Sequence, residues 1–352
     1  MRAFLISGAG AALTDADLPM PEPVGAEVLL RTLAVGVCHS DVHLHDGGFD
    51  LGQGKSLPAG REGLALGHEI AGEVVAIGPD AVGTAVGDRR VIYPWIGCGD
   101  CALCAGGREH LCDRGRALGV HVNGGFAEYV LVPDARYLFD PGDTGNALAC
   151  TYACSGLTAY SALKKAGLPG IDGPLLLVGL GGVGRNALGI ARGVFGVVPI
   201  VADIDDERLA AARDEGVEVA LNPSRPDEAR AALKAQGGCA AAIDFVGSEA
   251  SSAFAQRALG KGGTLVLVGL YGGTFSMPLP LIPMTERAVR GSYVGSLAEM
   301  AELMALVRAG RVPPMPIERR PASADAATTA LGDLRRGRVS GRAVLCYDDA
   351  AD

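Results

Sequence analysis

Residues 175–191 read LLLVGLGGVGRNALGIA, and this stretch decides the fold of the chain. Four apolar residues come first, Gly179, Gly181 and Gly184 follow in a GxGxxG pattern, and a helical pattern of apolar residues comes last. A buried strand, a tight glycine turn and a helix in this order are typical of the first unit of a dinucleotide-binding α/β domain. Because the chain has 52 glycines among 352 residues, the glycines alone carry little weight, and the interpretation depends on the strand and the helix around them.

An acidic residue follows the next apolar run, where dinucleotide-binding units place one. Asp203 lies nineteen residues after the last of these glycines. Such an acid accepts hydrogen bonds from the ribose diol of NAD and repels the 2′-phosphate of NADP. We therefore expect NAD as the cofactor, with its pyrophosphate over the turn that includes Gly182 and Val183. Arg208 lies close enough in sequence to contact the cofactor and soften this preference.

The rest of the chain shows two different patterns of apolar residues, one before and one after residue 150. After residue 150, apolar runs alternate with helical patterns, which predicts a doubly wound parallel sheet with helices on both faces. The expected helices of this part are 155–165, 206–215 and 248–258, and its expected strands are 175–178, 197–202, 240–245 and 264–268. After about residue 290, we expect a helix at 297–309, a further helical stretch and a closing strand at 342–346. The first 150 residues instead predict a mainly antiparallel β unit. Its expected strands are 27–34, 70–77, 89–93 and 126–132.

Four cysteines within residues 98–112, CGDCALCAGGREHLC, give the strongest chemical signal of the chain. Four thiolates complete a tetrahedral zinc site with no open position, so we expect a structural zinc that organises this loop. An iron–sulfur cluster also takes four cysteines, but its usual pattern places the last one three residues on and before a proline, which this loop lacks. The expected ligands are Cys98, Cys101, Cys104 and Cys112.

Three further candidates for metal binding are far apart in the sequence. They are Cys38 in GVCHSDVH, His68 beside Glu69 in LGHEI, and Cys154 in YACSGLTAY. Taken singly, each cysteine fits a small core residue and the histidine fits a hydrogen-bonded core residue. Spacing alone therefore does not join them into one site. Cys150 lies four residues before Cys154 and is the alternative ligand if that segment is helical.

Together, these motifs resemble those of the zinc-dependent alcohol dehydrogenases of the medium-chain dehydrogenase/reductase superfamily. The resemblance spans nearly the whole chain. It implies a catalytic zinc held by Cys38, His68 and Cys154 with a fourth position open, so that each chain carries two zinc ions. In this family the four-cysteine lobe, here about residues 95–114, lies between the second and third of these ligands.

The resemblance also implies a division into domains. A GroES-like, mainly β catalytic domain is expected to comprise residues 1–154 and 293–352. A Rossmann domain that binds NAD is expected to comprise residues 155–292. The reaction implied is the reversible transfer of hydride between a primary or secondary alcohol and NAD.

Further residues match the family's catalytic and cofactor-binding positions. Ser40 and His43 match the proton relay, Asp41 matches the acid that hydrogen-bonds the ligating histidine, and Glu69 matches the carboxylate behind the zinc. The residues that the resemblance places on the cofactor are His39, Thr158, Val268 and Arg342.

The segment between Cys38 and His68 is several residues longer than the family pattern. We expect its glycine-rich loop, residues 46–62, to lie beside the substrate entrance and to reshape the alcohol pocket together with Trp95. The other residues expected to line the pocket are Tyr93, Leu118 and Val294.

Composition limits the partners and the compartment. The formal net charge is −9 and the basic residues are scattered, so we expect no binding to nucleic acid or to an anionic membrane. The N-terminal stretch MRAFLISGAG has too short an apolar run for a signal peptide, which favours a soluble cytoplasmic protein. The short segment after Cys112 resembles that of tetrameric family members, so we expect a homotetramer, with a dimer as the alternative.

Other functions remain open on the sequence. A polyol, aryl-alcohol or formaldehyde (thiol-adduct) dehydrogenase of the same superfamily would share most of these motifs. A non-catalytic zinc and nucleotide binder, such as a redox sensor that uses its CxxC thiols, would also share them. The presence of Ser40 and His43 favours catalysis, because a sensor needs no proton relay.

Overall fold

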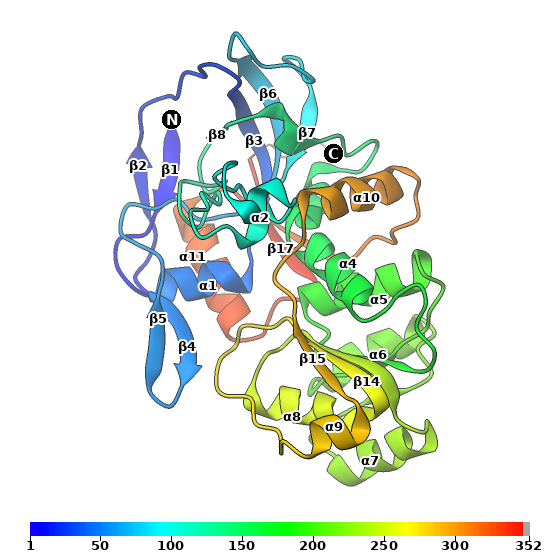
Figure 1. Ribbon diagram of the computed structural model, residues 1–352. Helices are drawn as coiled ribbons and strands as arrows, with labels where there is room; N and C mark the ends of the chain where they lie inside the picture. The colour runs from blue at the N-terminus through cyan, green and yellow to red at the C-terminus, as the bar shows by residue number, and fades with distance from the viewer. Residues whose placement is uncertain (348–352) are drawn as a thin grey trace.

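The computed structural model describes residues 1–347, so the last five positions of the expected catalytic domain lie outside the described residues. Two large sheets organise the chain (Figure 1). One has six strands in the order β12-β11-β10-β13-β14-β15, and the other has seven in the order β16-β17-β3-β6-β7-β9 with β8 beside β3. The two patterns of apolar residues in the sequence therefore correspond to two separate sheets.

All neighbouring strands in the six-stranded sheet are parallel, as a doubly wound fold requires. Its strands are β10 (Leu175–Val178), β11 (Ile200–Ala202), β12 (Ala220–Leu221), β13 (Cys239–Asp244), β14 (Leu259–Leu267) and β15 (Ala288–Gly291). The helices of this half are α4 (Ser155–Lys165), α5 (Gly182–Gly193), α6 (Asp206–Asp214), α7 (Pro226–Ala235), α8 (Glu249–Ala258) and α9 (Leu281–Thr285). Strand β10 is buried at all four positions because it lies inside the sheet and is covered on both faces.

The seven-stranded sheet is mainly antiparallel. Its strands are β3 (Val28–Gly36), β6 (Glu69–Ile77), β7 (Arg89–Ile92), β8 (Tyr129–Val132), β9 (Leu138–Phe139), β16 (Ile317–Pro321) and β17 (Arg342–Cys346). Because β17 pairs with β3, the end of the chain returns to the sheet formed by its beginning. A separate pair, β1 (Arg2–Leu5) and β2 (Thr14–Asp17), and the helices α1 (His39–Asp46), α2 (Ala102–Ala105), α3 (Asn146–Ala149), α10 (Leu297–Arg308) and α11 (Ala324–Arg335) complete this half.

Most predicted elements are confirmed, and the differences have local causes. Helix 155–165 and strands 175–178 and 342–346 have the predicted bounds. The strand predicted at 197–202 begins at Ile200, because the Val197 amide donates to the Ala191 carbonyl and still belongs to the end of α5. Helix α7 was missed, although Pro226 at its first turn followed by two acids is a typical helix start.

The expected loop 46–62 is in fact a two-stranded hairpin, β4 (Gly48–Gly52) and β5 (Lys55–Pro58). Its tip reaches the loop after β14 in the other half of the molecule (Figure 1). A Cβ atom added to Gly52 would lie 2.9 Å from the Gly273 carbonyl carbon, so the two backbones touch. The hairpin therefore bridges the two halves, which the sequence pattern did not indicate.

None of the helices within residues 1–347 is long and apolar enough to cross a membrane. The largest hydrophobic cluster extends from β3 and β6 through α4 to β10 and α5. Since α4 packs against both α5 and α10, this helix is the main apolar link between the two sheets.

Candidate functional site

Three ligand candidates from distant parts of the sequence meet at the junction of the two halves. Cys38 is the N-cap of α1, His68 directly precedes β6, and Cys154 is the N-cap of α4. One ligand atom from each, and one from Glu69, lie within 4.8 Å of one another. All four residues are buried. The tertiary structure thus joins residues that their spacing could not.

The hydrogen bonds of His68 show that this cluster suits a metal ion. Its Nδ1 lies 3.1 Å from Asp41 Oδ1, whereas its Nε2 is buried and has no hydrogen-bond partner. An imidazole whose Nδ1–H is held by a carboxylate presents the Nε2 lone pair, which is the usual arrangement of a zinc-ligating histidine. Together with two thiols, this donor set fits Zn²⁺ and leaves a fourth position for a substrate oxygen.

Asp41 holds the ligand cluster in place. Its Oδ2 accepts a hydrogen bond of 2.8 Å from the Cys38 amide, and its Oδ1 accepts one of 3.2 Å from the Gly67 amide. This fully buried carboxylate therefore fixes the backbone beside two of the three ligands. The structure places Asp41 in the contact with the ligating histidine that the family resemblance implied.

Glu69 lies behind the ligands and is bound by other groups. The Arg342 Nε donates to Glu69 Oε2 at 2.8 Å, Arg342 Nη2 donates to Oε1, and the Ser155 amide donates to Oε1 at 3.1 Å. Burial raises the pKa of Glu69, and the positive charge of Arg342 opposes that rise. Both carboxylate oxygens thus have hydrogen-bond partners, so Cys38, His68 and Cys154 are better candidates for metal ligands than Glu69.

Cys150 does not belong to this cluster. Its thiol is fully buried and donates to the Ala147 carbonyl at 3.4 Å. Burial is the main reason that the pKa of this thiol lies well above the ordinary value. The segment 150–153 forms a 3₁₀ turn that directs Cys154 toward the other ligands.

The four-cysteine loop forms a second cluster, with its ligand atoms also within 4.8 Å of one another. The sulfur atoms of Cys101 and Cys104 are 3.5 Å apart, and those of Cys101 and Cys112 are 3.8 Å apart. Helix α2 and a 3₁₀ turn at Glu109–Leu111 shape the loop. Because all nine cysteines are free, the close approach of four thiols fits a structural zinc and not a disulfide framework.

The proton-relay candidates lie on the first two turns of α1. Ser40 and His43 follow the ligand Cys38 on this helix, and the His43 ring contacts the Phe49 ring at 4.9 Å. Desolvation is the main cause that lowers the pKa of His43 below its ordinary value. A neutral His43 can therefore accept a proton at neutral pH. His39 begins the same helix, and desolvation is also the main cause that lowers its pKa.

The glycine turn has the geometry of a nucleotide-binding turn. Gly179 has φ 90°, and Gly181 is the N-cap of α5. A Cβ atom on Gly184 would lie 1.8 Å from the Gly179 carbonyl oxygen, so only glycine fits there. The unbonded N–H groups of this helix start favour an anion. Val183 lies on the same first turn.

Asp203 follows β11 beside this turn. It accepts hydrogen bonds of 2.6 Å from the Leu180 amide and 3.0 Å from the Asp205 amide. The Arg208 Nη1 lies 3.7 Å from Asp203 Oδ2, and Arg208 also contacts Asp205. Asp203 therefore holds the backbone of the glycine turn, and its contact with the ribose stays a prediction. Arg208 partly compensates its charge.

Arg342 has an unforeseen position. The family resemblance places this side chain on the cofactor, and the structure buries it in the ion pair with Glu69. Its Nη1 would also lie 3.0 Å from a Cβ atom on Gly182. The guanidinium thus lies between the metal cluster and the start of α5. Thr158 in α4 and Val268 after β14 are the other expected cofactor contacts. Thr158 is buried and Val268 is half-buried.

The expected pocket residues differ in what they contact. The Trp95 ring packs on the His68 ring with centroids 5.3 Å apart. Tyr93, in contrast, is fully buried and donates to the Gly295 carbonyl at 2.9 Å. This hydrogen bond ties Tyr93 to the backbone next to Val294, and the contact of Tyr93 with substrate stays a prediction. Leu118 and Val294 are buried, and their contact with substrate stays a prediction.

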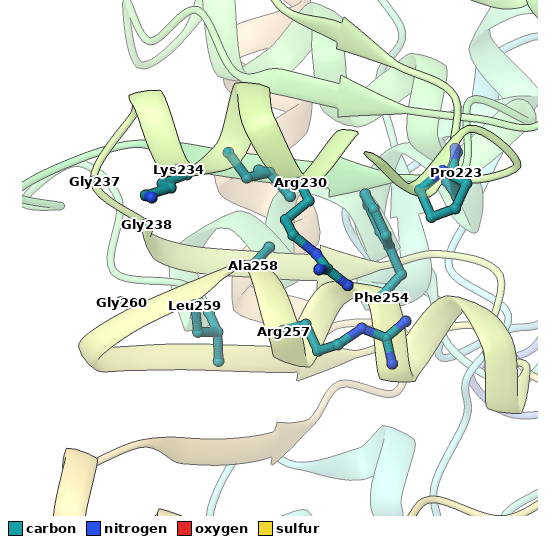
Figure 2. Close-up of a pocket in the computed structure, with 12 residues that line it drawn as sticks. Pro223, Arg230, Lys234, Gly237, Gly238, Phe254, Arg257, Ala258, Leu259 and Gly260 are labelled. Atoms are coloured by element: carbon teal, nitrogen blue, oxygen red, sulfur yellow. The ribbon is translucent and has the colours of Figure 1, made fainter. Parts of the chain in front are cut away.

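A cavity of about 500 Å³ lies elsewhere, between α7 and α8 (Figure 2). Gly237 and Gly238 before β13, and Leu259 and Gly260 at the start of β14, form part of its lining. It therefore lies at the amino ends of these strands, whereas nucleotides bind at the carboxyl ends. No cysteine or histidine lines it, so this cavity is separate from the metal cluster.

Comparison with known proteins agrees with this geometry. Residues 25–140 match the family described as "Alcohol dehydrogenase GroES-like domain", and residues 182–309 match "Zinc-binding dehydrogenase". The chain is 37% identical to an NAD-dependent alcohol dehydrogenase of Sulfurisphaera tokodaii, over 98% of this chain and 99% of that protein. It is also 37% identical to an NAD-dependent alcohol dehydrogenase of Saccharolobus solfataricus, with the same coverage.

Solved structures give the same result. The alcohol dehydrogenase from Aeropyrum pernix superposes with a TM-score of 0.86 at 29% identity, over 98% of this chain and 100% of that one. The chain therefore belongs to the zinc-binding alcohol dehydrogenases of the medium-chain superfamily, a family of NAD-dependent oxidoreductases.

We expect Cys154→Ala and Cys150→Ala to separate the ligand from its neighbour. Cys154→Ala removes one donor of the open cluster, so the zinc content should fall from two ions per chain to one. Cys150→Ala removes only a buried thiol, so two zinc ions should remain. Elemental analysis of the purified variants measures this. If both variants keep two zinc ions, Cys154 is not a ligand.

Proposed function

We propose that this chain catalyses the reversible oxidation of primary or secondary alcohols by NAD, with a catalytic zinc held by Cys38, His68 and Cys154. The observation that carries the proposal is the buried, unbonded His68 Nε2 beside two thiols, next to a nucleotide-binding turn. Once bound, the zinc would acidify the alcohol and NAD would accept the hydride. The products are a carbonyl compound, NADH and a proton.

The chain's own residues would remove that proton. The Ser40 hydroxyl lies two residues after a ligand and can accept it first, and a neutral His43 can pass it toward solvent. Asp41 keeps the His68 ring oriented during these transfers. The burial of all three ligands keeps bulk water away from the reacting atoms.

The direct test is NADH formation from a panel of primary, secondary and aromatic alcohols. We expect turnover with NAD, its loss on treatment with a strong chelator, and its recovery on addition of zinc. The structural zinc can also be lost, so circular dichroism must show that the treated protein is still folded. Full activity in zinc-free, folded protein would contradict the proposal.

We propose that Asp203 selects NAD over NADP. Asp203→Asn removes the charge and retains an acceptor for the Leu180 amide, so it isolates the electrostatic effect. We expect the ratio of kcat/KM for NAD to kcat/KM for NADP to fall about tenfold or more, which corresponds to roughly 1.4 kcal/mol. Asp205→Asn keeps an N-cap for α6 and should leave the ratio almost unchanged. If the two variants have the same ratio of kcat/KM for NAD to kcat/KM for NADP, Asp203 does not select the cofactor.

We further propose a homotetramer, or a dimer, assembled through the open edge of the parallel sheet, in the cytoplasm. Strand β15 ends the sheet and all four of its residues are exposed. Leu279 and Met284 beside it are 78% and 74% exposed, which is unusual for large apolar side chains on a monomer. The nine free thiols support a reducing compartment.

Val289→Lys tests this assembly. The new charge on β15 should break contacts at the sheet edge and reduce the molar mass measured by light scattering. Val82→Lys is the matched control, because Val82 is 80% exposed in a turn after β6. If the Val289 variant retains the assembly of the wild type, the interface lies elsewhere.

A further inference from the structure

We propose that Tyr293, together with Trp95, forms an aromatic wall beside the metal cluster and gives the enzyme a preference for alcohols that carry a planar aromatic ring. The inference rests on the proposed alcohol dehydrogenase function and narrows its substrate class. Tyr293 lies just after β15 and belongs to none of the motifs of the sequence.

A continuous row of rings leads from a metal ligand to solvent. The Trp95 ring packs on the His68 ring, and the Tyr293 ring packs edge-on against Trp95, with centroids 5.7 Å apart and planes at 67°. Trp95 is buried, and its Nε1 donates to the Ala153 carbonyl at 3.2 Å, next to the ligand Cys154. Tyr293 is 42% exposed, so part of its ring remains available to a ligand.

Ring contacts place Tyr293 close to the expected reacting centre. Desolvation and, after it, the charges of Cys154 and Cys38 raise the pKa of the Tyr293 phenol to about 12. The Trp95 ring joins Tyr293 to the His68 ring, so the phenol lies one ring away from a ligand candidate. A substrate whose oxygen occupies the open metal position would therefore carry its substituent past Tyr293.

The backbone around Tyr293 is held firmly. Val294 has φ 38°, a conformation that a β-branched residue rarely adopts and that surrounding contacts must enforce. The Ser292 amide donates to the Leu267 carbonyl at 2.9 Å on one side, and the Tyr93 hydroxyl donates to the Gly295 carbonyl on the other. These contacts hold the backbone on both sides of Tyr293, so binding need not order this segment, which reduces the entropy cost of binding.

Aromatic walls discriminate by ring electronics as well as by size. An aromatic substituent can make edge-to-face or offset contacts with Tyr293 and Trp95, and a saturated ring of similar size cannot. Phe49 of the hairpin packs against His43, so a further ring flanks the expected proton relay. Benzyl alcohol and cyclohexylmethanol, which have the same carbon skeleton, are therefore a matched pair of substrates.

The experiment compares kcat/KM for these two alcohols in the wild type and in three variants. Tyr293→Phe keeps the ring, Tyr293→Leu keeps apolar bulk without a ring, and Tyr293→Ala removes both. We expect the wild type and Tyr293→Phe to prefer benzyl alcohol, and the ratio to fall about three- to tenfold in the other two variants. An unchanged ratio in Tyr293→Leu and Tyr293→Ala overturns the inference.

Trp95 is the only tryptophan of the chain, so its fluorescence gives a second readout that needs no turnover. Titration of the zinc-loaded enzyme with benzyl alcohol should change this emission at lower concentrations than titration with cyclohexylmethanol. Tyr293→Leu should abolish the difference, and equal titrations in the wild type overturn the inference. If no alcohol reduces NAD, the proposed function fails; if turnover occurs without the aromatic preference, only the present inference fails.

Discussion

The buried ion pair between Glu69 and Arg342 is the constraint on which the site depends. Glu69 begins β6, Arg342 begins β17, and the Ser155 amide at the start of α4 also donates to the carboxylate. An isolated carboxylate in such a dry position would be very costly, so the segments that carry these groups must meet. Their meeting brings the ligands beside Glu69 and Ser155, namely His68 and Cys154, into one cluster.

This arrangement separates two tasks. Glu69 and Arg342 neutralise each other behind the cluster, and Asp41 orients the imidazole from the side. The His68 Nε2 atom has no hydrogen-bond partner among the described residues and lies beside two thiols, so this donor set suits a metal ion. The aromatic pair of Trp95 and Tyr293 lies beside the His68 ring. The charges of Glu69 and Arg342 thus balance each other, and the thiols and the imidazole remain available to a metal ion.

The sequence predicted the fold class and the elements with clear periodicity, such as α4 and β10. It did so because the spacing of apolar residues indicates which faces of a helix or strand are buried. It failed where pairing depends on distant contacts. Hairpin β4–β5 has few apolar residues, and its backbone contacts the loop after β14. Tyr293 escaped notice because it belongs to no motif, and only its contact with Trp95 reveals it.

By itself, the sequence determined the four-cysteine zinc loop and the glycine turn, because in both cases neighbouring residues supply all the chemistry. The family resemblance identified Cys38, His68 and Cys154 as a set, and spacing could not, since each residue alone fits a core position. Only the tertiary structure decided that their donor atoms converge, that Arg342 binds Glu69, and that the Tyr93 hydroxyl donates to the Gly295 carbonyl. The physical reason is that buried polar groups form hydrogen bonds with residues distant in the sequence. The pattern of apolar residues along the sequence indicates which positions are buried, but not which residues they contact.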